Sequence, residues 1–117
     1  MKSVLVVDDN AVNRKLAVAL LVRRGMHVEE ADGGVLALEK LRAGNFDAVL
    51  LDISMPVMDG KEVCQLIRAD ARLAGLWVVA YTAHAMESER QTIMAAGFDE
   101  LLVKPISAND LMRVLPD

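Results

Sequence analysis

Five short runs of strand-forming residues alternate along the chain with stretches whose apolar residues recur at helical spacing. The runs predict strands at residues 4–7, 27–30, 48–51, 76–81 and 101–103. Parallel neighbours in a sheet need long crossover connections, and such crossovers are right-handed. Five strands alternating with five helices therefore predict an α/β fold, a doubly wound parallel sheet covered by helices on both faces. Its central strands should be apolar throughout, as VLVV, AVLL and WVVAY are.

The predicted helices are marked by apolar residues three or four positions apart. Gly25, Gly44 and Gly97 stand where helices are expected to end, and Asp59 with Glu62, three residues on, is typical of a helix start. The apolar positions, helix by helix, are Val12, Leu16, Ala19 and Leu20; Val35, Leu38 and Leu41; Val63, Leu66 and Ile67; Met86, Ile93 and Met94; and, after Ser107, Leu111, Val114 and Leu115.

Length and composition are those of one globular domain spanning residues 1–117. The 117 residues, 54% of them hydrophobic, suffice for one substantial core. The formal net charge of −4 predicts no electrostatic attraction to nucleic acid or to an anionic membrane surface. The longest apolar run, at residues 16–22, is far below the roughly 20 residues that cross a bilayer. With a single cysteine, Cys64, and no signal-peptide pattern, we expect a soluble cytoplasmic protein.

Chemically active residues follow the predicted strands. Asp8 and Asp9 follow the first, Asp52 the third, Thr82 the fourth and Lys104 the fifth. Ligands of open parallel sheets bind beyond the carboxyl ends of the strands, so these side chains should meet at one edge. Two unit charges about 4 Å apart repel by roughly 4 kcal/mol at an effective dielectric constant near 20. Three carboxylates therefore predict a hard divalent cation, magnesium (Mg2+), which prefers oxygen ligands.

A carboxylate beside a metal ion can also act as a nucleophile toward phosphorus. We assign that role to Asp52, because the loop SMPVMDG that follows leaves its side chain accessible at the edge. Lys104 would neutralise a phosphoryl oxygen and Thr82 would donate a hydrogen bond to another. Taken singly, the aspartates are more typical of turns or helix caps, Thr82 of a local hydrogen bond and Lys104 of a surface loop. Only their ordered convergence favours the site.

The chain resembles the receiver domain of two-component response regulators over essentially its whole length. The resemblance rests on VVDDN, LLDISMPVMDG, YTA and LVKPI, in that order and spacing. It implies a five-stranded flavodoxin-like (βα)5 fold with strand order 2-1-3-4-5, and phosphorylation of Asp52 from a histidine. It also implies that Asp9 and Asp52 bind magnesium directly, that Asp8 acts partly through water, that the backbone carbonyl of Ser54 is a further ligand, and that the Lys104–Pro105 peptide bond is cis.

The variants VVDDNAVNR, YTAHAM and LVKPIS look like those of receivers associated with hybrid sensor kinases. The implied partners are a histidine kinase and/or a histidine phosphotransfer protein. An unknown output partner would bind the face formed by the fourth helix, fifth strand and fifth helix. Such a domain is a phosphoacceptor that promotes its own phosphorylation and dephosphorylation, not an enzyme acting on a separate substrate. Leu101 stands where many receivers have an aromatic switch residue, which predicts a weaker conformational response.

Two other functions share this fold class. Phosphatases or phosphotransferases of the haloacid dehalogenase type also form an aspartyl phosphate, but their two aspartates are usually separated by one residue, whereas Asp8 and Asp9 are adjacent. A flavodoxin-like binder of nucleotide or flavin needs a glycine- or hydroxyl-rich loop after the first strand, and DDNAVNR is neither. His27, His84 and Cys64 have no metal-ligand spacing.

Overall fold

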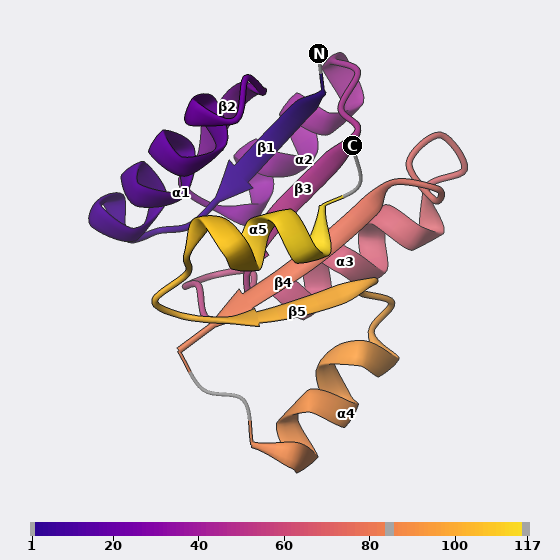
Figure 1. Cartoon of the computed structure of the whole chain (residues 1–117). Coiled ribbons are helices and arrows are strands. Elements are labelled where there is room, and N and C mark those ends of the chain that lie inside the picture. Colours follow the sequence, from indigo (N-terminus) through magenta and orange to yellow (C-terminus); the bar gives the residue numbers. More distant parts are fainter. Residues whose placement is uncertain (1, 84–85, 116–117) are drawn as a thin grey trace.

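The computed structural model of the chain describes residues 2–83 and 86–115, so His84 lies outside the described residues. Five strands alternate with five helices, as the sequence predicts (Figure 1). The sheet is parallel with strand order β2-β1-β3-β4-β5, which confirms the doubly wound fold and the order implied by the resemblance. The elements are β1 (Ser3–Val7), α1 (Ala11–Arg23), β2 (His27–Ala31), α2 (Gly34–Ala43), β3 (Ala48–Asp52), α3 (Gly60–Ala69), β4 (Trp77–Thr82), α4 (Glu87–Ala95), β5 (Glu100–Val103) and α5 (Ala108–Val114).

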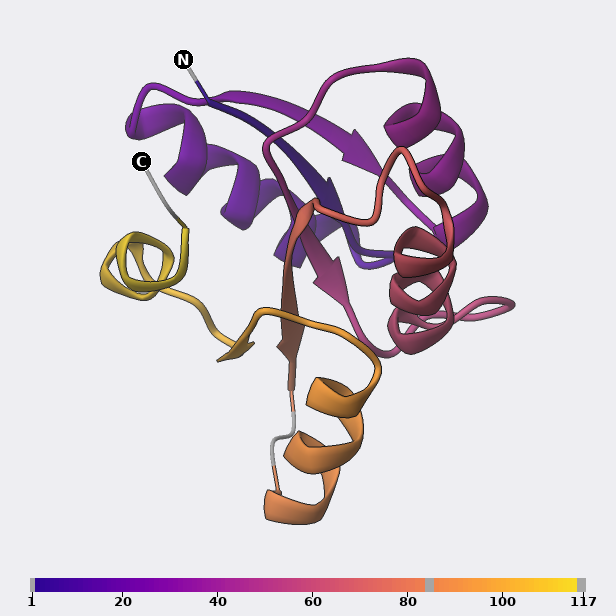
Figure 2. The ribbon, with the colours of Figure 1, turned by 90° about the vertical axis from the view of Figure 1, so that its right-hand side faces the viewer.

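Helices cover both faces of the sheet (Figure 2). One face packs against α1 and α5 through a core that includes Leu21, Leu50 and Leu111. The other packs against α2, α3 and α4 through a core that includes Leu51 and Ile67. The central strands are buried along almost their whole length because both of their faces are covered, as expected for a parallel sheet.

The apolar face predicted for α1 is wrong. Val12 is 79% exposed and Leu16 42% exposed, whereas Ala17 and Leu21 are the buried positions. The helix carries apolar residues around most of its circumference, so periodicity alone fits more than one face and packing against the sheet selects one. The same correction applies to single positions on the other helices, where Val35, Leu66, Met86 and Met94 are exposed.

The predicted helix ends are confirmed. Asp59 accepts a hydrogen bond from the Glu62 amide, and the Glu62 side chain accepts one from the Asp59 amide, forming a capping box at the start of α3. Gly44 caps α2, and Gly25 and Gly97 have φ angles of 84° and 112°, which glycine adopts without steric cost. Among the described residues, every helix is too short or too polar to pass through a bilayer.

Candidate functional site

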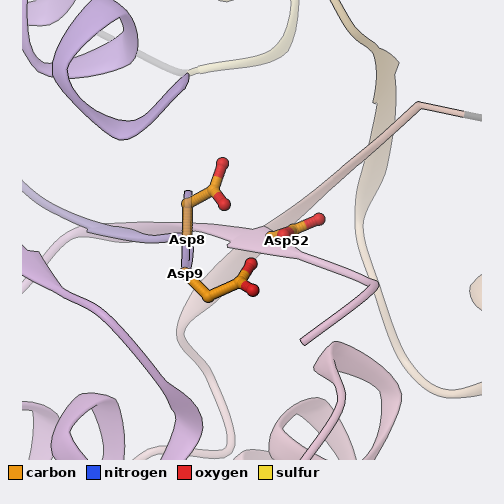
Figure 3. Close-up of side chains that lie close together, drawn as sticks. All are labelled: Asp8, Asp9 and Asp52. Carbon is orange, nitrogen blue, oxygen red and sulfur yellow. The ribbon is translucent and has the colours of Figure 1, made fainter. Parts of the chain in front are cut away.

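Three carboxylates meet at the carboxyl edge of the sheet (Figure 3). Asp8 and Asp9 follow β1 and Asp52 ends β3, and one oxygen from each lies within 4.8 Å of the others. Asp9 is exposed, whereas Asp8 and Asp52 are buried. The expectation that the loop after β3 leaves the Asp52 side chain accessible is therefore wrong: Asp52 is 3% exposed, because Lys104 lies against it. Residues from neighbouring strands that pair in register reach the same edge together, which is why positions far apart in the sequence converge.

Asp8 is held by three hydrogen bonds. Its Oδ1 accepts one from the Asn10 amide at 2.8 Å, and its Oδ2 accepts one from the Tyr81 hydroxyl at 2.6 Å and one from Lys104 Nζ at 3.2 Å. Burial alone would raise the pKa of Asp8, but the Tyr81 hydroxyl, the Asn10 amide and Lys104 together hold that pKa below its ordinary value. Asp8 is therefore the more acidic of the two buried carboxylates.

The pKa of Asp52 is shifted in the opposite direction to that of Asp8. Burial and repulsion by Asp8 raise its pKa from 3.8 to about 6, although Lys104 opposes the shift. Its Oδ1 lies 3.2 Å from Lys104 Nζ and 3.3 Å from the Ser54 amide nitrogen. A cation at the edge would remove this repulsion, so the charge of Asp52 depends on what occupies the site.

Lys104 connects the two buried carboxylates. Its Nζ is 3.2 Å from both Asp8 Oδ2 and Asp52 Oδ1, and 4.5 Å from the centre of the Tyr81 ring. The Lys104–Pro105 peptide bond is cis, as the resemblance implies. Thr82 is buried at the end of β4, and its carbonyl accepts a hydrogen bond from the Lys104 amide. Ser54, expected to offer its carbonyl, is exposed in the loop after β3.

The loop after Asp52 returns close to the strand because of Gly60. A Cβ atom at this position would collide with the carbonyl oxygen of Asp52, and the Gly60 amide donates to the carbonyl of Ile53. Glycine thus allows the first turn of α3 to lie against the end of β3. Gly60, in the loop sequence SMPVMDG, therefore allows the backbone conformation in which Asp52 ends β3.

Two residues of this environment are not among those predicted from the sequence. Tyr81, which donates to Asp8, was included only in a strand, although alternation along the strands places it on the same face as Asp8 and Asp52. Arg14 donates from Nη1 to the Asp8 carbonyl at 2.8 Å and from Nε to Glu30 at 2.9 Å. No local sequence pattern predicts this role for Arg14, because one partner is the backbone carbonyl of Asp8 and the other, Glu30, belongs to strand β2.

The donor set suits a small hard cation. Three carboxylates that follow or end two adjacent strands offer oxygen ligands, and among residues 2–83 and 86–115 no histidine or cysteine, which zinc prefers, joins the cluster. One acid is exposed, which leaves a side of the cluster open to water or a phosphoryl oxygen. The residues therefore fit magnesium.

Comparison with known proteins gives the same class. Residues 4–116 match the family described as "Response regulator receiver domain". The sensor protein GacS of Pseudomonas syringae is 40% identical over 115 residues, covering 96% of this chain and 13% of GacS. The signal transduction histidine-protein kinase BarA of Escherichia coli is 41% identical over 113 residues, covering 97% and 12%. The chain thus spans about an eighth of these relatives.

Solved structures agree with the fold. Chemotaxis protein CheY4 of Vibrio cholerae superposes with a TM-score of 0.91 at 32% identity, covering 98% of this chain and 99% of CheY4. The receiver domain of sensor histidine kinase PA1611 of Pseudomonas aeruginosa, described with a magnesium ion coordinated in the active-site cleft, gives 0.89 at 31% identity, covering 97% and 93%.

Fold and site define a doubly wound signalling domain with an acidic edge that can carry a phosphoryl group. The chain belongs to the response regulator receiver domain family, whose members are phosphoacceptors of two-component phosphorelays.

Proposed function

We propose that residues 1–117 form a single receiver domain in which Asp52 accepts a phosphoryl group from a phosphohistidine. The observation that carries this proposal is the position of Lys104 Nζ, 3.2 Å from Asp52 Oδ1, beside a cluster of three carboxylates at the sheet edge. In the step itself, an Asp52 oxygen attacks phosphorus and forms the acyl phosphate bond. The bond between phosphorus and the donor imidazole breaks, and the imidazole nitrogen keeps the electron pair and takes up a proton.

The residues around Asp52 have separate tasks in this step. Lys104 neutralises a phosphoryl oxygen as a point charge, and Thr82, at the end of the neighbouring strand, donates a hydrogen bond to another. Asp9 and Asp52 would hold magnesium directly, Asp8 partly through water, with the Ser54 carbonyl as a further ligand. Magnesium, when bound, supplies positive charge to the phosphoryl oxygens.

The donor is a histidine kinase or a histidine phosphotransfer protein. BarA and PA1611, named above, are histidine kinases. Helix α1 begins directly after the acidic cluster with an exposed apolar stripe that includes Val12 and Leu16. A protein donor that brings its histidine to Asp52 would cover this stripe. The unknown output partner would bind the face of α4, β5 and α5. A cytoplasmic location is part of the proposal, since Cys64 is a buried free thiol.

Intact-mass measurement tests the acceptor. Wild type and Asp52→Asn are incubated with a small phosphodonor such as acetyl phosphate, with magnesium or with EDTA. We expect a phosphoryl adduct on the wild type in magnesium only. An equal adduct on Asp52→Asn, or an adduct that forms equally in EDTA, would refute the assignment.

A matched pair of variants tests the donor surface. Leu16 on α1 and Leu66 on α3 are 42% and 41% exposed and lie on opposite faces of the sheet. With a phosphorylated histidine phosphotransfer protein as donor, Leu16→Asp should slow transfer at least tenfold and Leu66→Asp should not. Both should react with acetyl phosphate at the wild-type rate. A Leu16→Asp variant that accepts normally from the protein donor would exclude the α1 stripe.

A further inference from the structure

Tyr81 is the chain's only tyrosine, and its hydroxyl ends at the acidic cluster. The residue is 1% exposed, with its ring packed in the core between the sheet and the helices α1 and α5. Its hydroxyl donates to Asp8 Oδ2 at 2.6 Å, the shortest of the three hydrogen bonds that Asp8 accepts from Asn10, Lys104 and Tyr81. A tyrosine hydroxyl buried on a carboxylate is a strong, directional contact.

Asp8 and Asp52 share Lys104, and this sharing has a consequence for phosphorylation. When Lys104 Nζ turns to a phosphoryl group on Asp52, Asp8 Oδ2 loses that ammonium group as a partner. Asp8 is 0% exposed, and a buried carboxylate oxygen left without any hydrogen-bond donor costs its full desolvation free energy. The Tyr81 hydroxyl remains in place because its ring is fixed in the core. Tyr81 can therefore keep Asp8 Oδ2 satisfied while Lys104 is engaged elsewhere.

We propose that Tyr81 is a positioning residue of the phosphorylation site: its hydroxyl holds the Asp8 carboxylate and thereby releases Lys104 to the phosphoryl group. This inference rests on the proposed phosphoacceptor function. Tyr81 needs no contact with the phosphoryl group for this role, since it acts through Asp8. The Tyr81 ring also makes a cation–π contact with Lys104 Nζ, which lies 4.5 Å from the ring centre, and this contact is retained when only the hydroxyl is removed.

Tyr81→Phe isolates the hydroxyl. Without it, Lys104 is the only side chain among the described residues that donates to Asp8 Oδ2, so the ion pair holds Lys104 more firmly. A hydrogen bond to a charged group is worth enough for a change of roughly tenfold or more in an equilibrium constant. We expect Tyr81→Phe to bind beryllofluoride, in saturating magnesium, about tenfold more weakly than the wild type, as measured by ¹⁹F NMR titration.

Trp77→Phe is the matched control for general damage to the core. Trp77 lies on the same strand and the same face, and its Nε1 donates to the Val114 carbonyl at 2.8 Å, at the end of β4 remote from the cluster. Both variants lose one ring hydrogen bond, so both should be somewhat less stable. Only Tyr81→Phe should lose beryllofluoride affinity. Equal losses in the two variants, or wild-type affinity in Tyr81→Phe, would overturn the inference.

A second measurement detects the hydrogen bond between the Tyr81 hydroxyl and Asp8 in the absence of any ligand. With ¹³Cζ-labelled tyrosine, the protein gives one phenol signal, which needs no assignment because the tyrosine is unique. In EDTA the wild-type signal should be displaced from that of Asp8→Ala, and the displacement should persist when magnesium and beryllofluoride are added. Identical signals in wild type and Asp8→Ala would overturn the inference. If the wild type binds no beryllofluoride at all, the phosphoacceptor proposal fails and the role of Tyr81 fails with it.

Discussion

Replacing Asp52 by asparagine should stabilise the metal-free fold. The pKa of Asp52 is raised to about 6 by burial and by repulsion from Asp8, against an ordinary 3.8. At 1.36 kcal/mol per pKa unit, ionising this buried group costs the folded state roughly 3 kcal/mol. The amide of Asp52→Asn keeps the shape of the carboxylate and can still accept from the Ser54 amide, but it carries no charge. We therefore expect a gain of about 2 to 3 kcal/mol at pH 8.

The stability difference between wild type and Asp52→Asn should depend on pH. Because the pKa of Asp52 is higher in the folded state than in the unfolded chain, the folded state holds an extra proton between about pH 4 and pH 6. The wild type loses stability as the pH rises through this window, and Asp52→Asn does not. The difference in free energy of unfolding should be small at pH 4, grow through the window and stay constant above pH 7.

Urea unfolding in EDTA, followed by the fluorescence of the single tryptophan Trp77, measures this difference. With a slope of about 2 kcal/mol per molar urea, the midpoint of Asp52→Asn should exceed that of wild type by roughly 1 M at pH 8. Added magnesium should stabilise the wild type and narrow the gap. Asp32→Asn, which changes an exposed carboxylate after β2, serves as control and should move the midpoint little. A gap of equal size at pH 4.5 and pH 8, or no gap at pH 8, would refute the reasoning.

Four further substitutions have defined outcomes. Asp9→Ala should weaken magnesium binding at least tenfold by calorimetric titration without loss of stability, since it removes a ligand and a repulsive charge. Val57→Asn should raise the free energy of unfolding by about 1 kcal/mol, because Val57 is 97% exposed with φ at 71°, where a β-branched residue is strained. Arg68→Met should lower it by about 3 kcal/mol, since Arg68 donates to three carbonyl groups and to the Asp99 carboxylate. Leu101→Tyr should enlarge the amide shifts that beryllofluoride and magnesium induce along α4 and β5, and unchanged shifts would show that an aromatic there is dispensable.

The fold was predictable because its pattern is local. Strand-like runs, helices of crossover length, glycines at helix ends and the capping box each depend on a few neighbouring residues. Four observed strands are one residue longer than predicted, and β4 is shifted by one residue, to Trp77–Thr82 from 76–81. The carboxylate cluster was also predictable, since residues that end adjacent parallel strands must share an edge. The element order places Asp8, Asp9 and Asp52 at one edge, and the strand order implied by the resemblance places β1 beside β3.

The remaining features depend on how elements pack. The buried face of α1 could not be chosen from periodicity, because Leu16 and Leu21 are equally apolar and only the sheet distinguishes them. Arg68 binds backbone carbonyls, which carry no sequence signal. Tyr81 reaches Asp8 across β3, so its role depends on the spacing and twist of three strands as well as on alternation.

Neighbouring residues of β4 connect the site to different faces of the sheet. The Tyr81 ring lies in the core under α1 and α5, while Ala80 and Leu101 belong to the packing on the other face, toward α3 and α4. On that second face, Leu101 stands where the resemblance leads us to expect an aromatic switch residue, which predicts weaker coupling to a change at Thr82. On the first face, the buried hydrogen bond from the Tyr81 hydroxyl connects Asp8 to the core beneath α1. The buried hydrogen bond thus leads from the site toward the helix proposed to meet the phosphohistidine donor. We therefore expect a domain that passes phosphoryl groups rather than one that strongly remodels α4.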